Sequence, residues 1–225
     1  MAEQSAVKHP IFARFFDRLS EKEERLGQAE HRRQLLAGLS GRVIEVGAGN
    51  GLNFKSYPPE VSHVLAVEPE PYLRERAREA AASAPVPIEV VDSVADRLPA
   101  NDASFDAGVA SLVLCSVPDQ GAALAELFRV IRPGGELRFH EHIRGHGESL
   151  ARFQDAATIV WPTFAGGCHP NRDTGAAITA AGFSIESCRR FSFRPCFFCA
   201  PVAPRILGGA RRPQDDRAPA VRPGS

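Results

Sequence analysis

The chain has 225 residues, of which 44% are hydrophobic and 24% are charged, so it is long enough for one ordinary globular domain. Its 27 Lys and Arg residues balance its 27 Asp and Glu residues, which excludes a polyanion binder that works through net charge. No apolar run approaches the ~20 residues of a membrane-spanning helix, and the N-terminus lacks the pattern of a signal peptide. Five cysteines, an odd number without dense spacing, predict a cytoplasmic protein with reduced thiols.

The first 40 residues predict two helices that form an N-terminal cap on the following domain. Residues 11–19 carry apolar side chains at helical spacing, and residues 21–39 are heavily charged with leucines as their apolar positions. A lid over a substrate is an alternative role for these helices. We expect the main domain to span residues 41–205 and residues 206–225, rich in Pro, Arg, Asp and Gly, to be a disordered tail.

From residue 42 onward, short apolar runs alternate with helical segments. The predicted strands are residues 42–46, 63–68, 88–92, 105–113, 136–142, 183–189 and 195–202. The predicted helices between them are residues 51–56, 71–84, 119–131 and 174–181. Strands that are apolar throughout and alternate with helices are typical of a parallel sheet covered on both faces. The fold class expected is therefore α/β.

The sharpest local signal is the run EVGAGNG at residues 45–51, in which a strand leads into a loop with three glycines. Bare backbone lets a ligand approach closely, and open parallel sheets bind ligands at the carboxyl ends of their strands. A dinucleotide motif would need glycine at the position of Leu52, and the carboxylate of Glu45 would repel pyrophosphate. The loop therefore favours a cationic nucleoside without phosphates, a description that fits S-adenosylmethionine.

Two more carboxylates follow the next two predicted strands. Glu68 can accept hydrogen bonds from both ribose hydroxyls, and Asp92 can accept one from the adenine amino group. Each residue alone is also an ordinary helix cap or a solvated loop residue. Together with Glu45 they stand in register at three consecutive strand ends, and this combination predicts an S-adenosylmethionine site.

These motifs resemble those of the class I S-adenosylmethionine-dependent methyltransferases, with a methyltransferase type 11 domain over about residues 40–190. Residues 45–51 are similar to the family's first motif, Glu68 to its second-strand acid, and residues 92–93 to its adenine-contacting position. Residues 45–58, 112–117 and 141–142 look most like the methyltransferase-like 7 group, whose members methylate alkyl thiols.

The resemblance implies a Rossmann-like sheet of seven mostly parallel strands, S-adenosylmethionine as the cofactor and a small molecule as the methyl acceptor. Neither nucleic acid nor a membrane is expected as a partner, and the oligomeric state, monomer or homodimer, stays open. The residues expected to contact the cofactor are Glu45, Gly47, Ala48, Gly49, Asn50, Asn53, Glu68, Pro69, Asp92, Ser93, Val94, Ser111, Leu112 and Ser116.

Methyl transfer from a sulfonium requires an acceptor held in line with the reacting carbon. A thiol, with an ordinary pKa of ~8.5, needs little help from a base. His142 is the preferred general base or orienting group because it ends the fifth predicted strand, and Glu141 beside it is the second catalytic candidate. The alternative role for His140, His142 and His146 is to satisfy loop carbonyls. No metal is expected, because the spacing of His140, His142, His146 and His169 does not indicate a metal site.

The cysteines and the aromatic residues leave alternatives open. Packing is the default role for Cys115, and for Cys196 and Cys199 within the last strand, whereas Cys168 is also a candidate for substrate contact or disulfide exchange. Residues 153–164, which contain Trp161, form either the wall of an acceptor pocket or ordinary core.

The sequence thus predicts an S-adenosylmethionine-dependent methyltransferase of a small lipophilic acceptor, with a thiol as the first choice. The alternatives are O- or C-methylation of a natural-product or quinone-like metabolite, which would demand a true base, and a non-catalytic S-adenosylmethionine-binding protein. A dehydrogenase is disfavoured because Leu52 stands where a dinucleotide loop needs glycine.

Overall fold

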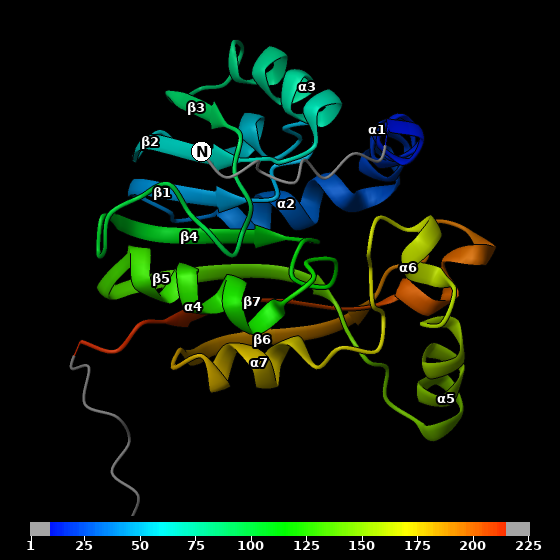
Figure 1. Cartoon of the computed structure of the whole chain (residues 1–225). Helices are drawn as coiled ribbons and strands as arrows, with labels where there is room; N and C mark the ends of the chain where they lie inside the picture. Colours follow the sequence, from blue (N-terminus) through cyan, green and yellow to red (C-terminus); the bar gives the residue numbers. More distant parts are fainter. Residues whose placement is uncertain (1–9, 215–225) are drawn as a thin grey trace, which may run out of the picture.

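The computed structural model describes residues 10–214, and a single seven-stranded sheet lies at its centre (Figure 1). The strands are β1 (Gly41–Val46), β2 (Val61–Val67), β3 (Ile88–Val91), β4 (Phe105–Ser111), β5 (Ile131–His142), β6 (Ser184–Ser192) and β7 (Pro204–Arg211). Their order is β3-β2-β1-β4-β5-β7-β6; the first five are parallel, and β7 runs antiparallel to both of its neighbours. The predicted α/β fold with a mostly parallel, Rossmann-like sheet is confirmed.

Three of the helices begin at an acidic side chain that caps them. Glu70, Asp119 and Asp173 each accept a hydrogen bond from a backbone N–H in the first turn of the helix that follows. The helical elements are α1 (Pro10–Glu23), the π-helical η1 (Glu24–Gln28), α2 (Ala29–Leu36), the 3₁₀ turn η2 (Phe54–Ser56), α3 (Pro71–Ala81), α4 (Gln120–Val130), α5 (Glu148–Ala157), α6 (Trp161–Phe164), α7 (Thr174–Ala180) and the 3₁₀ segment η3 (Phe197–Val202).

The hydrophobic core lies on both faces of the sheet. On one face, Leu124 and Leu127 of α4 and Ile178 of α7 pack against strand residues such as Ile44. On the other face, the packing partners of the strands come from α2, η2 and α3. Because both faces are covered, β1, β2 and β4 carry nearly continuous apolar residues, which is the pattern that made these strands visible in the sequence.

The two predicted N-terminal helices are present, and they occupy different places in the fold. Leu35 and Leu36 of α2 pack into the core beside the sheet. The helical path kinks at Gly27, between α1 and α2, where φ is 118°. On the far side of this kink, α1 lies beyond the carboxyl ends of β1 and β4, the end of the sheet to which their arrowheads point (Figure 1). In the part of the chain that is described, no helix has the length and apolar character needed to cross a membrane.

The predicted boundary of a disordered tail at residue 206 is wrong, because β7 spans Pro204–Arg211 between β5 and β6. Gly208, one of the glycines in this stretch, has a packing reason. A Cβ at Gly208 would overlap the carbonyl oxygen of Ser187 on β6 and would lie 2.8 Å from the ring of Phe139 on β5. Residues 215–225 of the expected tail lie outside the described residues.

Two further expectations for local structure are corrected. Residues 195–202 do not form the last strand; most of them form η3, where Pro201 cannot donate a ladder hydrogen bond. This turn brings Cys196 and Cys199 within 5.3 Å between Cα atoms, and the pair forms a disulfide, so the expectation of five reduced thiols is wrong for these two. Of the helix expected at residues 51–56, only the short turn η2 is formed.

The crowding at Gly208 predicts a difference between two adjacent glycines. Gly208→Ala should lower the free energy of unfolding by about 1–3 kcal/mol, because backbone atoms of β6 cannot move away without breaking the sheet. Gly209→Ala is the matched control, since its Cβ would meet only side-chain atoms, those of Arg138 at 3.4 Å and Ser187 Oγ at 3.6 Å. Denaturant unfolding of both variants measures the effect, and equal stabilities would contradict this account of β7.

Candidate active site

The glycines of the loop after β1 leave its backbone without side chains of its own. Gly47 and Gly49 have φ angles of 64° and 58°, which favour glycine, and a Cβ at Gly47 would overlap Val113. A Cβ at Gly49 would lie 3.4 Å from the ring of Phe16 on α1. The predicted loop residues Gly47, Ala48 and Gly49 therefore present bare backbone between two neighbouring segments of the chain.

Glu68 follows β2 and is joined directly to this loop. Its Oε2 accepts a hydrogen bond from the N–H of Gly49 (2.8 Å), and its Oε1 accepts one from the N–H of Glu70 (2.9 Å). Burial raises the pKa of Glu68 to about 7, against the opposing effect of these two N–H groups. Each oxygen keeps a second lone pair, so the carboxylate can still accept two hydroxyl groups. This arrangement fits the ribose of a nucleoside.

Glu45 and Asn53 belong to a buried network that joins β1 to α2. Glu45 accepts hydrogen bonds from Asn53 Nδ2 (2.6 Å) and the Tyr57 hydroxyl (2.7 Å), and Asn53 Oδ1 accepts one from Arg32 (2.8 Å). Burial raises the pKa of Glu45 to about 7. These contacts show how Glu45 and Asn53 support the loop; their direct contact with a cofactor stays a prediction.

Arg74 ties the ends of β2 and β3 together, a role that the sequence analysis did not identify. Its guanidinium lies 3.0 Å from Asp92 Oδ2 and donates to the carbonyl oxygens of Glu68 (3.0 Å) and Pro69 (2.8 Å). The side chain of Asp92 stays 54% exposed, so it remains accessible to a ligand. Beyond it, Ser93 donates to the carbonyl of Arg97 (2.7 Å), and Val94 pairs with Arg97.

The cap helix α1 is bonded to the glycine loop. Asn50 Nδ2 donates to Asp17 Oδ1 (2.8 Å) and to Ser20 Oγ (3.1 Å), and Asn50 is itself buried. The Tyr72 hydroxyl of α3 also donates to Asp17 (3.0 Å). Asp17 and Ser20 were not predicted; their i, i+3 spacing on one side of a helix was the available signal. The structure thus shows Asn50 as an anchor for the cap, and its contact with the cofactor stays a prediction.

Glu141 holds the loop that follows β4. Its Oε1 accepts from the N–H groups of Val113 (3.0 Å) and Leu114 (2.9 Å), and its Oε2 accepts from the N–H of Cys115 (3.1 Å). It is fully buried, and burial raises its pKa well above the ordinary value. Leu112 in the same loop has a positive φ of 59°, rare for a residue other than glycine and typical of functional loops.

His142 points toward two cysteines rather than toward the other predicted histidines. Its Nδ1 lies 3.5 Å from Cys115 Sγ and 3.5 Å from Cys168 Sγ. A hydrogen bond with Cys168, together with burial, raises the pKa of Cys115 to about 12, so Cys115 is a neutral thiol at neutral pH rather than a nucleophile. Ser116 follows in the same loop, with its Oγ 3.6 Å from Cys115 Sγ.

The four histidines considered as metal ligands are not brought together. His140 is buried beside Gln28, whose Nε2 lies 3.3 Å from its Nδ1, and burial lowers its pKa well below the ordinary value. His169 Nδ1 lies 2.7 Å from the carbonyl of Gly167. Within residues 10–214, the group of side chains that could hold a metal ion is Cys115, His142 and Cys168.

The aromatic insertion after β5 is divided between surface and interior. Phe153 and Phe164 are 51% and 74% exposed, whereas Trp161 packs against the buried cluster that contains Cys115 and Cys168. Figure 1 shows α5 and α6 grouped beyond the carboxyl ends of the parallel strands. Trp161 is therefore placed to border the region next to His142.

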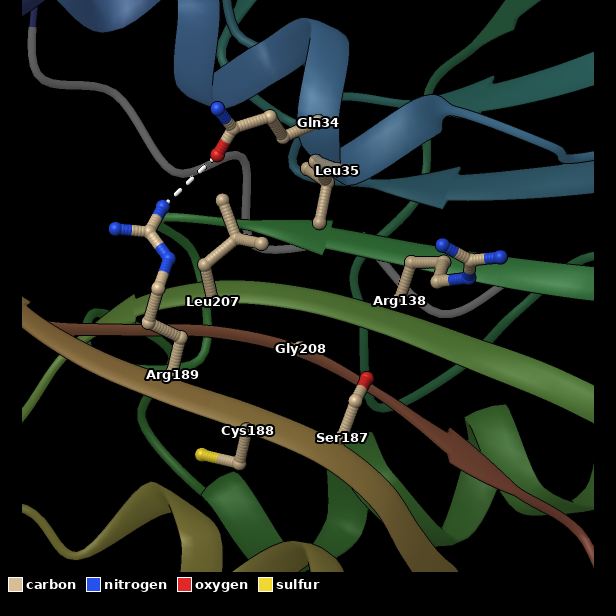
Figure 2. A pocket seen from close by; sticks show the side chains of 8 residues that line it. All are labelled: Gln34, Leu35, Arg138, Ser187, Cys188, Arg189, Leu207 and Gly208. Atoms are coloured by element: carbon tan, nitrogen blue, oxygen red, sulfur yellow. Dashed lines mark hydrogen bonds between the residues drawn. The ribbon is translucent and has the colours of Figure 1, made fainter.

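A separate hollow of about 320 Å³ lies between α2 and the β5, β7 and β6 strands (Figure 2). It is lined by Gln34, Leu35, Arg138, Ser187, Cys188, Arg189, Leu207 and Gly208. Arg189 donates to Gln34 Oε1 (2.9 Å) across its mouth. None of these residues is among those predicted for the cofactor, so the candidate site is the strand ends rather than this hollow.

Comparisons with known proteins agree with this geometry. Residues 44–139 match the family described as "Methyltransferase domain". The chain is 34% identical to the human thiol S-methyltransferase TMT1B over 181 residues, which is 78% of this chain and 73% of the relative. It is 35% identical to the human thiol S-methyltransferase TMT1A over 157 residues, 67% of this chain and 64% of the relative.

Solved structures share the fold. A putative methyltransferase from Bacillus halodurans superposes with a TM-score of 0.65 at 18% identity, covering 81% of this chain and 97% of that one. The chain therefore belongs to the class I S-adenosylmethionine-dependent methyltransferases. Within that class it is similar to the thiol S-methyltransferases. The prediction of the family and of its cofactor is confirmed.

The raised pKa of Glu68 predicts a pH-dependent affinity for S-adenosylmethionine. The ionised carboxylate attracts the cation and accepts two hydroxyls, whereas the protonated form loses its charge and one acceptor site. Binding therefore favours the ionised form. The affinity should be highest above pH 7 and fall as the pH drops below 7, by up to about tenfold per pH unit for one linked proton.

Calorimetric titration from about pH 5.5 to 8.5 measures this dependence. Glu68→Gln should bind more weakly and lose the slope, because an amide does not titrate. Glu89→Gln, which alters an exposed carboxylate on β3, should keep both the affinity and the slope. A slope that persists unchanged in Glu68→Gln would refute the assignment.

Proposed function

We propose that this methyltransferase transfers the methyl group to the sulfur of a small lipophilic thiol. The observation that carries the choice of acceptor is the 34% identity, over most of both chains, to a relative named as a thiol S-methyltransferase. The surroundings of His142 support it. Cys115, Cys168, Cys199 and Val202 form a buried apolar cluster there, with Trp161 packed against it. Such a surface suits a lipophilic acceptor better than a strongly polar one.

The residues proposed to hold the cofactor are those whose backbone or carboxylate groups can still form hydrogen bonds with S-adenosylmethionine. The backbone of residues 47–49 and the carboxylate of Glu68 would hold the nucleoside, and the exposed carboxylate of Asp92 would accept from adenine. When bound, S-adenosylmethionine supplies a methyl group activated by a sulfonium. Ser111 ends β4 beside this region and Leu112 follows it, and the Ser111 hydroxyl is buried with no hydrogen-bond partner among the described residues.

The chemistry asks little of the protein beyond position. The acceptor sulfur bonds to the methyl carbon as the carbon–sulfonium bond breaks, and the electron pair of that bond stays on the leaving sulfur. The thiol proton is given up to solvent. We assign activation of the thiol to His142, which stands at the end of β5. We assign a positioning role to Glu141, because its carboxylate holds the backbone that carries Cys115.

The compartment is part of the same proposal. Cys115, Cys168 and Cys188 are free thiols, which is typical of a reducing compartment, and the Cys196–Cys199 disulfide is the exception. We therefore propose that the enzyme works in the cytoplasm.

Matched pairs of acceptors test the proposed function. With labelled S-adenosylmethionine, benzyl mercaptan should be methylated and benzyl alcohol should not, and thiophenol should be preferred over phenol. Product masses identify the methylated atom. Glu68→Ala should lose turnover at low cofactor concentration, whereas Glu89→Ala, on the exposed side of β3, should retain it. Methylated phenols without methylated thiols would show instead an O-methyltransferase.

A further inference from the structure

Three soft metal ligands meet beside the loop that follows β4. The two contacts from His142 Nδ1, to Cys115 Sγ and to Cys168 Sγ, are both 3.5 Å long. All three ligand atoms lie within 4.8 Å of one another. They come from three separate segments: the loop after β4, the end of β5 and the turn after α6.

The distances agree with those of a tetrahedral zinc site. Zn–S bonds of about 2.3 Å and Zn–N bonds of about 2.0–2.1 Å, at tetrahedral angles, place a nitrogen and a sulfur ligand about 3.5 Å apart. A neutral imidazole offers one lone pair on Nδ1, so it accepts from one of the two thiols, and the other thiol is left with a sulfur as its acceptor. Sulfur is a weak acceptor, whereas a metal ion would use all three ligand atoms.

The three side chains are held in place before any ion arrives. Cys115 is fully buried, and Cys168 is 4% exposed. The backbone N–H of Cys115 is fixed by Glu141, and the Cys115 carbonyl accepts from the N–H of His169 (2.7 Å), which ties the two cysteine segments together. Nearby, His142 Nε2 and Trp161 Nε1 are buried polar atoms without a hydrogen-bond partner among the described residues. Unpartnered buried atoms of this kind indicate a ligand or bound water.

We propose that Cys115, His142 and Cys168 bind a thiophilic divalent cation, with Zn²⁺ as the first choice, and leave one coordination position open. Three protein ligands with an open position are typical of catalytic rather than structural zinc sites. This second step rests on the proposed function: the open position takes the sulfur of the acceptor thiol. Coordination removes the thiol proton to solvent, with no change of oxidation state, and delivers a thiolate.

Cobalt(II) is the probe that tests the site directly, because thiolate-bound tetrahedral Co²⁺ absorbs visible light. The reduced, metal-free full chain should bind one Co²⁺ with these bands. Cys115→Ser and Cys168→Ser should each bind at least about tenfold more weakly. Cys188→Ser is the matched control, since this free cysteine is exposed on β6 (Figure 2), and it should bind like the parent. The double variant Cys196→Ser, Cys199→Ser should also bind like the parent.

Two further measurements distinguish a loss of metal binding from a loss of the fold, and test whether the acceptor thiol reaches the metal. S-Adenosylmethionine binding by calorimetry should persist in Cys115→Ser and Cys168→Ser, which shows that the fold is intact. Benzyl mercaptan should shift the cobalt bands of the parent protein, and benzyl alcohol should not.

The metal site is overturned if the parent shows no cobalt bands, if the cysteine variants bind cobalt equally well, or if mass mapping finds a Cys115–Cys168 disulfide in the freshly purified protein. Cobalt binding without any thiol methylation would instead count against the proposed function alone.

Discussion

The contact between the Glu68 carboxylate and the N–H of Gly49 is the interaction on which the site depends. It joins the end of β2 to the loop after β1 and sets a carboxylate beside a backbone whose glycines carry no side chain of their own. A carboxylate in this place accepts the hydroxyl groups of a ribose. The fold alone is shared by many enzymes, so this contact, rather than the sheet, defines a nucleoside site, and Glu45 and Leu52 in the neighbouring loop disfavour a pyrophosphate there.

A second carboxylate organises the acceptor side in the same way. Glu141 binds three consecutive N–H groups of the loop after β4, so that its position on β5 determines the path of that loop. His142, the next residue on β5, then faces the thiols of Cys115 and Cys168. One strand thus supplies both the group that shapes the loop and the group nearest to the chemistry.

Much of the fold and of the cofactor site could be predicted from the sequence, because the signals were local. The apolar runs of β1, β2 and β4, the glycine loop and the carboxylate of Glu68 each depend on a few neighbouring residues. β7 was missed because its glycines are explained only by the neighbours on β6 and β5 that they touch. The cap contact between Asp17 and Asn50 joins residues 33 positions apart, and the local i, i+3 spacing of Asp17 and Ser20 does not identify Asn50 as their partner.

The acceptor side was the least predictable part for the same reason. Cys115 lies 27 positions before His142, and Cys168 lies 26 positions after it. Helices α5 and α6 lie between His142 and Cys168 in the chain. The sequence proposed Glu141 as a catalytic candidate from its place on the strand. Only the structure shows that its carboxylate is engaged by backbone N–H groups.

A crystal structure of the protein with S-adenosylhomocysteine tests the central claim most directly. The account predicts that both ribose hydroxyls lie within hydrogen-bond distance of the Glu68 carboxylate and that the nucleoside lies against the backbone of residues 47–49. A nucleoside bound elsewhere, for instance in the hollow between α2 and β6, or one whose ribose makes no contact with Glu68, would contradict it.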